Sequence, residues 1–374
     1  MTAKAPVFLY GTLCDPDLFG IVSGVAFQPK PAKLAGHAVA WVKGENFPIL
    51  TESAKASATG ALVHVDTEAR ARLDFYELGF GYNLVTRRVD TDDGQKDALV
   101  YLPPPDTWSP GLAWSLADWQ STHGPLAREA AREYMRLHTT LTPAAAARAF
   151  PQVRMRAASR LRAGAHPSPA YAHQIGLDTL QLEKTAQPYT DYFAVQEDIL
   201  RFPRFDGSVS APVKRATFLG GDAVTVLPYD PSTNSVLVVR QFRHGAYCRG
   251  DTNPWTLEPA AGRIDPGESP EETARRELLE ETGVKIDRLV QVGQYYPSPG
   301  AYSEFIYSYV AQADLSGVSG GIGGLEDEAE DIMSHVIPLP DLLRLIETGA
   351  ANTAPLILSA LWLAANRDRL PGMD

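Results

Sequence analysis

The stretch GRIDPGESPEETARRELLEETGV, residues 262–284, decides how the second half of this 374-residue chain folds. Ser269 is a favoured N-cap residue, Pro270 suits the first helical position, and Glu272 completes a Ser-x-x-Glu capping box. Gly283 is placed to end the helix, because glycine readily adopts the left-handed conformation found there. The stretch therefore predicts one helix of about three turns.

The predicted helix carries carboxylates on one face. Glu277 and Glu281 are four residues apart and Glu280 is three beyond Glu277, so their Cβ atoms lie about 5–6 Å apart. Like charges at this spacing repel, and a divalent cation would turn the repulsion into binding. Oxygen ligands favour Mg²⁺ or Mn²⁺ over Zn²⁺. The alternative is a solvated acidic helix with Arg275 and Arg276 as local partners.

The whole stretch fits the pattern Gly-x5-Glu-x7-Arg-Glu-U-x-Glu-Glu-x-Gly-U, with U apolar, and so resembles the Nudix hydrolases. The fixed positions are filled by Gly262, Glu268, Arg276, Glu277, Leu278, Glu280, Glu281, Gly283 and Val284. The resemblance implies an α/β/α sandwich with a mixed sheet and hydrolysis of a nucleoside diphosphate linked to another moiety. It implies Glu277 and Glu281 as metal ligands, with Glu280 assisting as a ligand or through water. Glu268 and Arg276 would hold the loop and helix together.

Flanking features resemble the ADP-ribose pyrophosphatases within this family. Residues 239–243 and 255–262 resemble the segments that precede this pattern, here called the Nudix box, in those enzymes. There the backbone carbonyl of the residue before the first glycine of the Nudix box is also a metal ligand, and that residue is Ala261 here. Downstream, Pro299 lies 15 residues after Val284 and directly after Ser298, and Glu304 follows shortly afterwards. Each piece alone would suit an ordinary strand end or turn. The resemblance implies that Ser298 and Glu304 contact the substrate. We also expect Arg243 and Arg215 to bind it, because a guanidinium fork binds phosphate bidentately.

Other substrates and one other class of protein remain open at this point. Another nucleotide sugar, NADH or a similar dinucleotide is the rival within enzymes. A non-catalytic ADP-ribose sensor is the alternative from a different class. The intact set of acids argues against the sensor, because such sensors can discard metal ligands.

A second acidic stretch, LEDEAEDI at residues 325–332, follows the glycine-rich residues 317–324. A hinged loop that brings a carboxylate to a bound diphosphate is a recurrent gate, although a solvated loop has the same composition. The stretch resembles the catalytic loop of ADP-ribose pyrophosphatases. That resemblance implies Glu328 as general base for the attacking water and Glu330 as a further metal contact. The expected products are AMP and ribose 5-phosphate, with Mg²⁺ or alternatively Mn²⁺ as cofactor.

Composition narrows the class of protein. The chain is 44% hydrophobic and 21% charged, as in soluble globular domains. Its net charge of −11 disfavours nucleic-acid binding, and most of the acidic excess lies in segments 258–281 and 326–331. Only Cys14 and Cys248 occur, without metal-ligand spacing, and no apolar run suits a secretory signal or a membrane span. We therefore expect a cytoplasmic protein without a membrane or nucleic-acid partner.

The tetrapeptide Tyr10, Gly11, Thr12 and Leu13 ends an apolar run at a turn, where glycine lets backbone N–H groups face an anionic ligand. Further along, Glu77 precedes Tyr82 and a strand with two arginines. Together, over residues 6–105, these motifs resemble the γ-glutamylcyclotransferase-like proteins, which have a Tyr-Gly-Ser-Leu loop and a catalytic Glu. In that family the Glu takes a proton from the substrate α-amine, which attacks the γ-glutamyl carbonyl to give 5-oxoproline. Glu77 is the matching residue.

This sequence departs from that family at two positions. Thr12 replaces the usual Ser, and Leu78 stands where the family commonly has Gly directly after the Glu. A ligand-binding or dimer-forming module is therefore the alternative to a cyclotransferase. A cyclotransferase-like domain ahead of a Nudix domain resembles bacterial proteins associated with tellurite resistance. Because Nudix proteins of the ADP-ribose type are commonly dimers, we expect a homodimer.

The predicted organisation is a γ-glutamylcyclotransferase-like mixed β barrel in residues 1–110, a helical connector in 111–185 and the Nudix domain in 186–374. Breaks in the connector are expected at Pro125, Pro143 and Pro151. The arginines at 154, 156, 160 and 162 indicate the solvated face of a helix or, alternatively, a basic partner site. Strands are expected at 7–10, 60–65, 83–89, 98–102, 223–227, 235–241, 289–296 and 304–310, and closing helices near 339–348 and 355–366.

Overall fold

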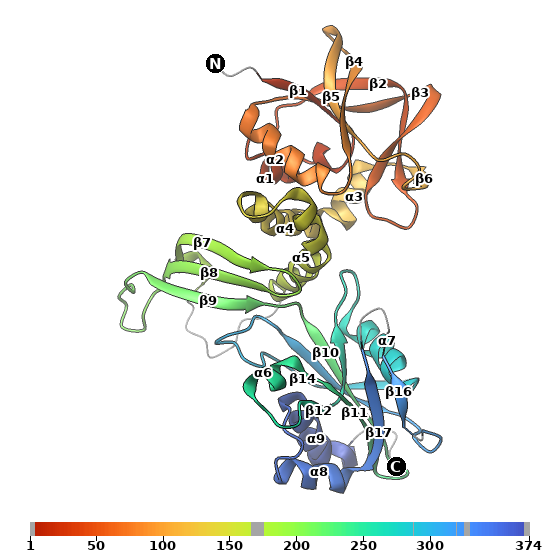
Figure 1. Ribbon diagram of the computed structural model, residues 1–374, viewed down its shortest axis with the longest axis vertical. Helices are drawn as coiled ribbons and strands as arrows, with labels where there is room; N and C mark the ends of the chain where they lie inside the picture. Colours follow the sequence, from red (N-terminus) through yellow and green to blue (C-terminus); the bar gives the residue numbers. More distant parts are fainter. Residues whose placement is uncertain (1–3, 166–175, 287, 319, 325–329, 370–374) are drawn as a thin grey trace. The chain divides into compact units, whose positions relative to one another are not determined.

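The structure is a computed structural model that describes all residues except 1–3, 166–175, 287, 319, 325–329 and 370–374 (Figure 1). Its contacts divide the chain into two compact units, Met1–Arg215 and Ala216–Asp374. The domain boundaries expected at 110 and 185 remain a prediction. The strands that directly follow the connector belong mainly to the first unit.

The first unit begins with a closed β barrel. Its strands hydrogen-bond in the order β3-β1-β5-β4-β2-β6, and a further pairing of β2 with β3 closes the ring. The strands are β1 (Ala5–Leu9), β2 (Lys30–Val42), β3 (Pro48–Val65), β4 (Asn83–Thr91), β5 (Gly94–Leu102) and β6 (Pro110–Ala113). The predicted mixed barrel is therefore confirmed. Strand β2 was not predicted, because its Lys, Ala, Gly and His residues have low strand propensity.

Alternation along β1 builds two apolar layers in this unit. Phe8 and Tyr10 join the cluster between the barrel strands, whereas Val7 and Leu9 pack against the helices. These helices are α1 (Pro16–Ser23), α2 (Thr67–Leu78), α3 (Leu116–Thr122), α4 (Gly124–Tyr134) and α5 (Pro143–Ala163). The connector helices therefore share one hydrophobic core with the barrel.

The prolines of the connector act at helix starts, with one exception. Pro125 and Pro143 lie in the first turns of α4 and α5, where a missing N–H costs nothing. The break expected at Pro151 is wrong, because α5 runs through that residue. Val153 and Ala157, both fully buried on the same helix, hold α5 against the core beyond the proline.

The arginine face of α5 is not solvated as expected. Arg156 is 2% exposed and pairs with Glu133 of α4, which is 1% exposed, at 2.7 Å. Arg160 bridges Glu129 and Glu133, at 2.6 and 2.8 Å. Burial disfavours the charged form of Glu133, but the two guanidinium groups hold its pKa below the usual value. The solvated-face prediction was wrong because the acidic partners lie on another helix.

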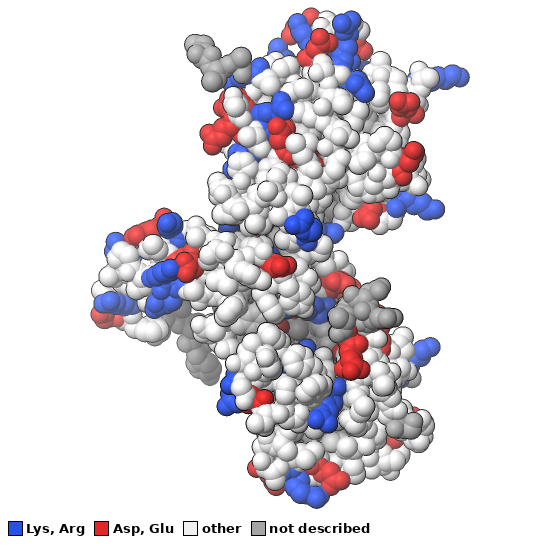
Figure 2. Space-filling model, in the orientation of Figure 1, with Lys and Arg blue, Asp and Glu red and all other residues white. Residues whose placement is uncertain are grey.

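A three-stranded sheet follows the connector. It consists of β7 (Gln181–Thr190), β8 (Ala194–Arg201) and β9 (Val213–Leu219). Figure 2 shows basic and acidic side chains intermixed on its visible face. In this sheet and its flanks Arg201 pairs with Glu183, and Lys214 pairs with Glu197. Gln187 of β7 donates a hydrogen bond to Glu133 (3.3 Å) and so joins this sheet to α4.

The second unit is built on an eight-stranded mixed sheet. Its main path runs β14-β15-β10-β11-β17-β16, with β12 on β11 and β13 on β10. The strands are β10 (Ala223–Asp230), β11 (Ser235–Phe242), β12 (Trp255–Glu258), β13 (Ala260–Arg263), β14 (Arg288–Tyr295), β15 (Ile306–Gln312), β16 (Gly321–Gly323) and β17 (Ile332–Pro338).

Helices cover both faces of this sheet (Figure 1). Leu237 and Val239 face α7 (Pro270–Thr282), whereas Val236 and Val238 face α8 (Leu339–Glu347) and α9 (Ala354–Asn366). Helix α7 has the predicted capping box and ends at Gly283 with φ 71°. A short helix α6 (His244–Arg249) follows β11. The predicted α/β/α sandwich is confirmed, and none of the described helices is long and apolar enough to cross a membrane.

Candidate functional site

Helix α7 presents Glu281 to strand β13. The side chain is 2% exposed, and its Oε2 accepts a hydrogen bond from the backbone N–H of Ala261 (3.2 Å). Its Oε1 is buried and has no hydrogen-bond partner among the described residues. Leaving a buried carboxylate oxygen without a donor is costly unless a ligand or cation meets it.

Glu277, one turn earlier on α7, lies against Gly262. A Cβ added at Gly262 would lie 1.9 Å from Cδ of Glu277, so only glycine leaves room for this carboxylate. The first glycine of the box is thus explained by close packing between β13 and α7.

The two carboxylates fit a divalent cation. Burial raises the pKa of Glu277 to about 7 and that of Glu281 to about 8, and the nearby charge of Glu330 adds to both shifts. A bound cation would favour the ionised forms. Within the described part of the chain no three His, Cys, Asp or Glu side chains gather into a metal cluster. The residues that could hold a metal here are Glu277, Glu281 and Ala261, whose backbone N–H contacts Glu281.

Arg276 braces the acidic face of α7. Its Nε and Nη2 donate to Glu268 (both 3.0 Å), which ties the preceding loop to the helix. Its Nη1 lies 2.9 Å from Glu277 and donates to Glu280 (3.0 Å). The structure thus places Glu268 and Arg276 in the bracing position that the motif implies, and Glu280 beside them.

Arg243, at the end of β11, is held by a residue that the sequence did not reveal as part of the site. Its Nε and Nη2 donate to the carboxylate of Glu258, with a shortest distance of 2.6 Å. Burial opposes the charge of Arg243, but Glu258 together with Glu281 and Glu330 raises its pKa. The only signal for Glu258 was its place in the lead-in to the box.

Four further residues were predicted for this site, three for substrate binding and one as the general base. Burial raises the pKa of Glu304, whose charge interacts with Arg263 and Arg243. Ser298 is exposed, and its carbonyl accepts hydrogen bonds within the turn at 298–302. Arg215 lies in the other compact unit and donates to the Lys214 carbonyl. Glu328 lies outside the described residues.

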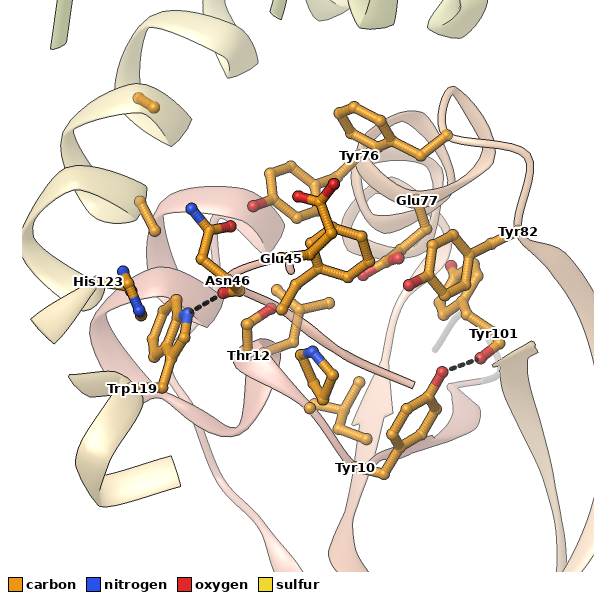
Figure 3. A pocket seen from close by; sticks show the side chains of 18 of the residues that line it. Tyr10, Thr12, Glu45, Asn46, Tyr76, Glu77, Tyr82, Tyr101, Trp119 and His123 are labelled. Carbon is orange, nitrogen blue, oxygen red and sulfur yellow. Dashed lines mark hydrogen bonds between the residues drawn. The ribbon is translucent and has the colours of Figure 1, made fainter. Parts of the chain in front are cut away.

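The first unit contains a cavity of about 380 Å³. Its wall is formed by the end of β1, the β2–β3 hairpin, α2 and the connector helices (Figure 3). Tyr10, Gly11, Thr12, Leu13 and Glu77 all line it, so the structure brings together both motifs that the sequence analysis singled out.

Glu77 is surrounded by tyrosines. Figure 3 shows Tyr10, Tyr76, Tyr82 and Tyr101 around it, and burial, together with the charge of Glu77, raises the pKa of each of them. Burial raises the pKa of Glu77 itself to about 7. The carboxylate accepts no hydrogen bond from any residue that the structure describes. An unpaired carboxylate of this kind, facing a cavity, suits a general base near neutral pH.

The predicted loop at the end of β1 is fixed on both sides. The Tyr10 hydroxyl donates to the Tyr101 carbonyl (2.8 Å), and a Cβ added at Gly11 would lie 2.8 Å from Cγ of Pro48. Thr12 opens a short 3₁₀ helix, Thr12–Cys14.

Sequence reasoning missed the other side of this cavity. Trp119, His123 and Arg154 come from the connector, and the Trp119 Nε1 donates to the Asn46 carbonyl (3.0 Å). No motif links these residues to the barrel, so their place in the site follows only from the packing of α3, α4 and α5.

The fold and the box define the class of this protein, a Nudix hydrolase. Residues 220–358 match the profile of the NUDIX domain, and residues 7–121 match that of the family described as gamma-glutamyl cyclotransferase, AIG2-like. The chain belongs to the Nudix family, with a cyclotransferase-like domain ahead of the catalytic one. The predicted Nudix-type hydrolase is thereby confirmed, as is the resemblance of the first domain.

Particular relatives are similar to the second half. The chain is 36% identical over 182 residues to an ADP-ribose pyrophosphatase of Escherichia coli (strain K12), covering 49% of this chain and 86% of that protein. It is 32% identical over 184 residues to an ADP-ribose pyrophosphatase of Haemophilus influenzae, covering 49% and 84%. A GDP-mannose pyrophosphatase of Escherichia coli O1:K1 / APEC is 30% identical over 173 residues, covering 46% and 88%.

Proposed function

We propose that the second unit hydrolyses the diphosphate of ADP-ribose to AMP and ribose 5-phosphate, with Mg²⁺ as cofactor. The observation that carries this proposal is the buried Glu277 and Glu281 pair, in which Oε1 of Glu281 has no partner among the described residues. The similarity to ADP-ribose pyrophosphatases supports the substrate. The GDP-mannose pyrophosphatases among the relatives keep other nucleotide sugars as the alternative.

The residues of this site have three proposed roles, which are metal binding, positioning of the glutamates and proton transfer. Glu277, Glu281 and the Ala261 carbonyl would hold the metal, with Glu330 as a further contact. The cation, when bound, neutralises phosphate oxygens and lowers the pKa of a water. Arg276 keeps Glu277 and Glu280 in place. Glu328 is proposed as the base that takes the proton of the attacking water.

Arg243 is proposed to bind the substrate. Its bidentate pairing with Glu258 holds the planar guanidinium in one orientation beside the acidic site. A diphosphate can compete for the same fork because it offers acceptor oxygens of similar geometry, and the guanidinium plane can stack on an adenine. Ser298 and Glu304 are proposed as weaker contacts from the neighbouring turn.

The experiment is a substrate panel with Mg²⁺, comprising ADP-ribose, GDP-mannose, other nucleotide sugars and NADH. We expect AMP from ADP-ribose, and a loss of at least ~100-fold in kcat for Glu281→Gln, which removes a ligand oxygen. Glu347→Gln, at the exposed end of α8, is the matched control. ADP-ribose that binds but stays intact would instead identify a sensor, and near wild-type rates for Glu281→Gln would refute the site.

A second candidate function rests on a separate observation, the unpaired Glu77 in the tyrosine-lined cavity. We propose that the first unit is a γ-glutamyl cyclotransferase. Glu77 takes a proton from the substrate α-amine, the amine nitrogen attacks the γ-carbonyl, and the proton passes to the leaving amine. Release of 5-oxoproline from γ-glutamyl dipeptides, lost in Glu77→Gln, tests this. Silence across a broad panel would leave a binding or dimer-forming module.

Oligomeric state and location are proposals of a coarser kind. A homodimer is proposed from the resemblance to ADP-ribose-type Nudix proteins, and light scattering of the intact protein measures it. Cys14 and Cys248 are free, which suits the reducing cytoplasm that we propose as its location.

A further inference from the structure

The cavity of the first unit is completed by residues beyond the part that matches the cyclotransferase family. That match ends at residue 121. The lining continues with His123, with Leu126 and Ala130 of α4, and with Phe150 and Arg154 of α5. One wall of the site is therefore contributed by the connector.

Arg154 brings a positive charge into that wall. The residue is half-buried, and its guanidinium makes no ion pair or hydrogen bond with any residue that the structure describes. The next arginines on the same helix, Arg156 and Arg160, are both paired with acids of α4. A half-buried guanidinium that has no acceptor among the described residues keeps its donors available for an anionic group.

His123 lies beside Arg154. Burial and the charge of Arg154 lower the pKa of His123, so its ring is neutral near pH 7 and offers one N–H donor. The ring makes an edge contact with Trp41 but no hydrogen bond with a described residue. The acids that line the same cavity are Glu77 and the solvent-exposed Glu45 of the β2–β3 hairpin. The Arg154 and His123 wall thus lacks an acidic partner and suits an anion.

The two ends of the cavity differ in chemistry. Figure 3 shows His123 and Trp119 across the cavity from Glu77 and Tyr82. A γ-glutamyl substrate must place its α-amine at Glu77, so its α-carboxylate, two bonds away, stays at that end. The opposite end is left for the group attached through the γ-amide.

We propose that Arg154, with His123, is a specificity-determining subsite that binds a carboxylate on the leaving amine. The cavity is then selective for γ-glutamyl amino acids or peptides over simple γ-glutamyl amines. This inference rests on the proposed cyclotransferase function. In the reaction the α-amine nitrogen bonds to the carbonyl carbon of the γ-glutamyl group, and the amide C–N bond of that carbonyl breaks. The proton lost by the α-amine goes to the leaving nitrogen, so 5-oxoproline and an amino acid leave with no co-reactant.

The test compares γ-glutamylalanine with γ-glutamylethylamine, which differ only by that carboxylate. We expect kcat/KM for γ-glutamylalanine to be at least ~10-fold higher in the wild-type protein, as for a charge-assisted hydrogen bond. Arg154→Gln should remove this preference, mainly by raising KM for γ-glutamylalanine. Arg154→Lys should restore part of it. Arg148→Gln, an exposed position on the same helix, is the matched control.

Binding separates this inference from the activity on which it rests. Calorimetry with the Glu77→Gln protein should show the same preference for γ-glutamylalanine, and Arg154→Gln in that background should abolish it. If neither compound yields 5-oxoproline but the binding preference is present, the cyclotransferase function fails and the subsite stands. Equal binding of the two compounds, a preference that survives Arg154→Gln, or no binding of either would overturn the subsite. Equal melting temperatures of the Glu77→Gln protein with and without Arg154→Gln show that the second substitution does not affect folding.

Discussion

At the scale of single residues, the partners of a buried carboxylate distinguish chemistry from architecture. Glu133 is buried between Arg156 and Arg160, and its pKa is lowered. Glu77 and Glu281 are also removed from water, but neither has a paired cation, and burial raises the pKa of each to about 7 and about 8. An acid kept in this costly state is a candidate for binding or proton transfer.

Gly262→Ala tests the close packing behind Glu277. The new Cβ would overlap the Glu277 carboxylate, so we expect a displaced ligand and at least ~100-fold slower hydrolysis. The stability cost should be about 1–3 kcal/mol, as for overpacking. Gly293→Ala in β14 is the control, because nothing lies within 4 Å of its Cβ position. Initial rates and urea denaturation measure both effects, and unchanged hydrolysis in Gly262→Ala would contradict the packing.

The pKa of Glu77 predicts how the first activity depends on pH. Only the carboxylate accepts a proton, so kcat/KM for 5-oxoproline release should rise about tenfold per pH unit below a midpoint near 7. The free energy of unfolding should fall as the pH rises from about 4.5 to about 7, because the pKa of Glu77 is raised above its ordinary 4.5 in the folded protein and ionisation therefore favours the unfolded state. Glu77→Gln should be about 1–3 kcal/mol more stable than wild type at pH 8 and equal to it at pH 4. Thermal melts at the two pH values decide this.

At the scale of elements, the packing of α4 on α5 depends on the buried acid of α4. Glu133→Gln would leave Arg156 buried without its counter-charge, and we expect a loss of about 3–5 kcal/mol. Glu183→Gln removes the acid from an exposed ion pair between Glu183 of β7 and Arg201 of β8, and it should cost less than about 1 kcal/mol. Urea denaturation of both variants makes the comparison. Similar small losses would mean that the α4–α5 network contributes little.

Elements could be predicted where their signals are local. Helix α7 was predicted correctly because the residues that define its ends, Ser269, Pro270 and Gly283, act through contacts within the helix itself. Strand β2 was missed and the face of α5 misread, because long-range pairing decides both. Arg156 looks solvated until Glu133 is known to lie opposite. In the same way the box glutamates could be read from spacing, whereas Glu258, His123 and Arg154 enter their sites only through tertiary packing.

At the scale of the whole molecule, the two proposed reactions have different requirements. Hydrolysis needs a divalent cation, whereas the Glu77 reaction uses only protein groups. EDTA should therefore abolish release of AMP and leave release of 5-oxoproline within about twofold, and Mg²⁺ should restore the former. Both products are measured in one sample of the intact protein. Loss of both reactions on chelation would show that the first site also needs a metal.

Because the connector contributes part of the first cavity, a segment that carries the whole cavity must be longer than the part that matches the cyclotransferase family. A gene fusion that took only residues 7–121 would carry Glu77 and its tyrosines but not Arg154. The transferable segment must extend through α5, and through β7 as well if Gln187 is to keep its bond to Glu133. Selection for the substrate preference of the first unit therefore acts also on residues beyond residue 121, where the match to the cyclotransferase family ends.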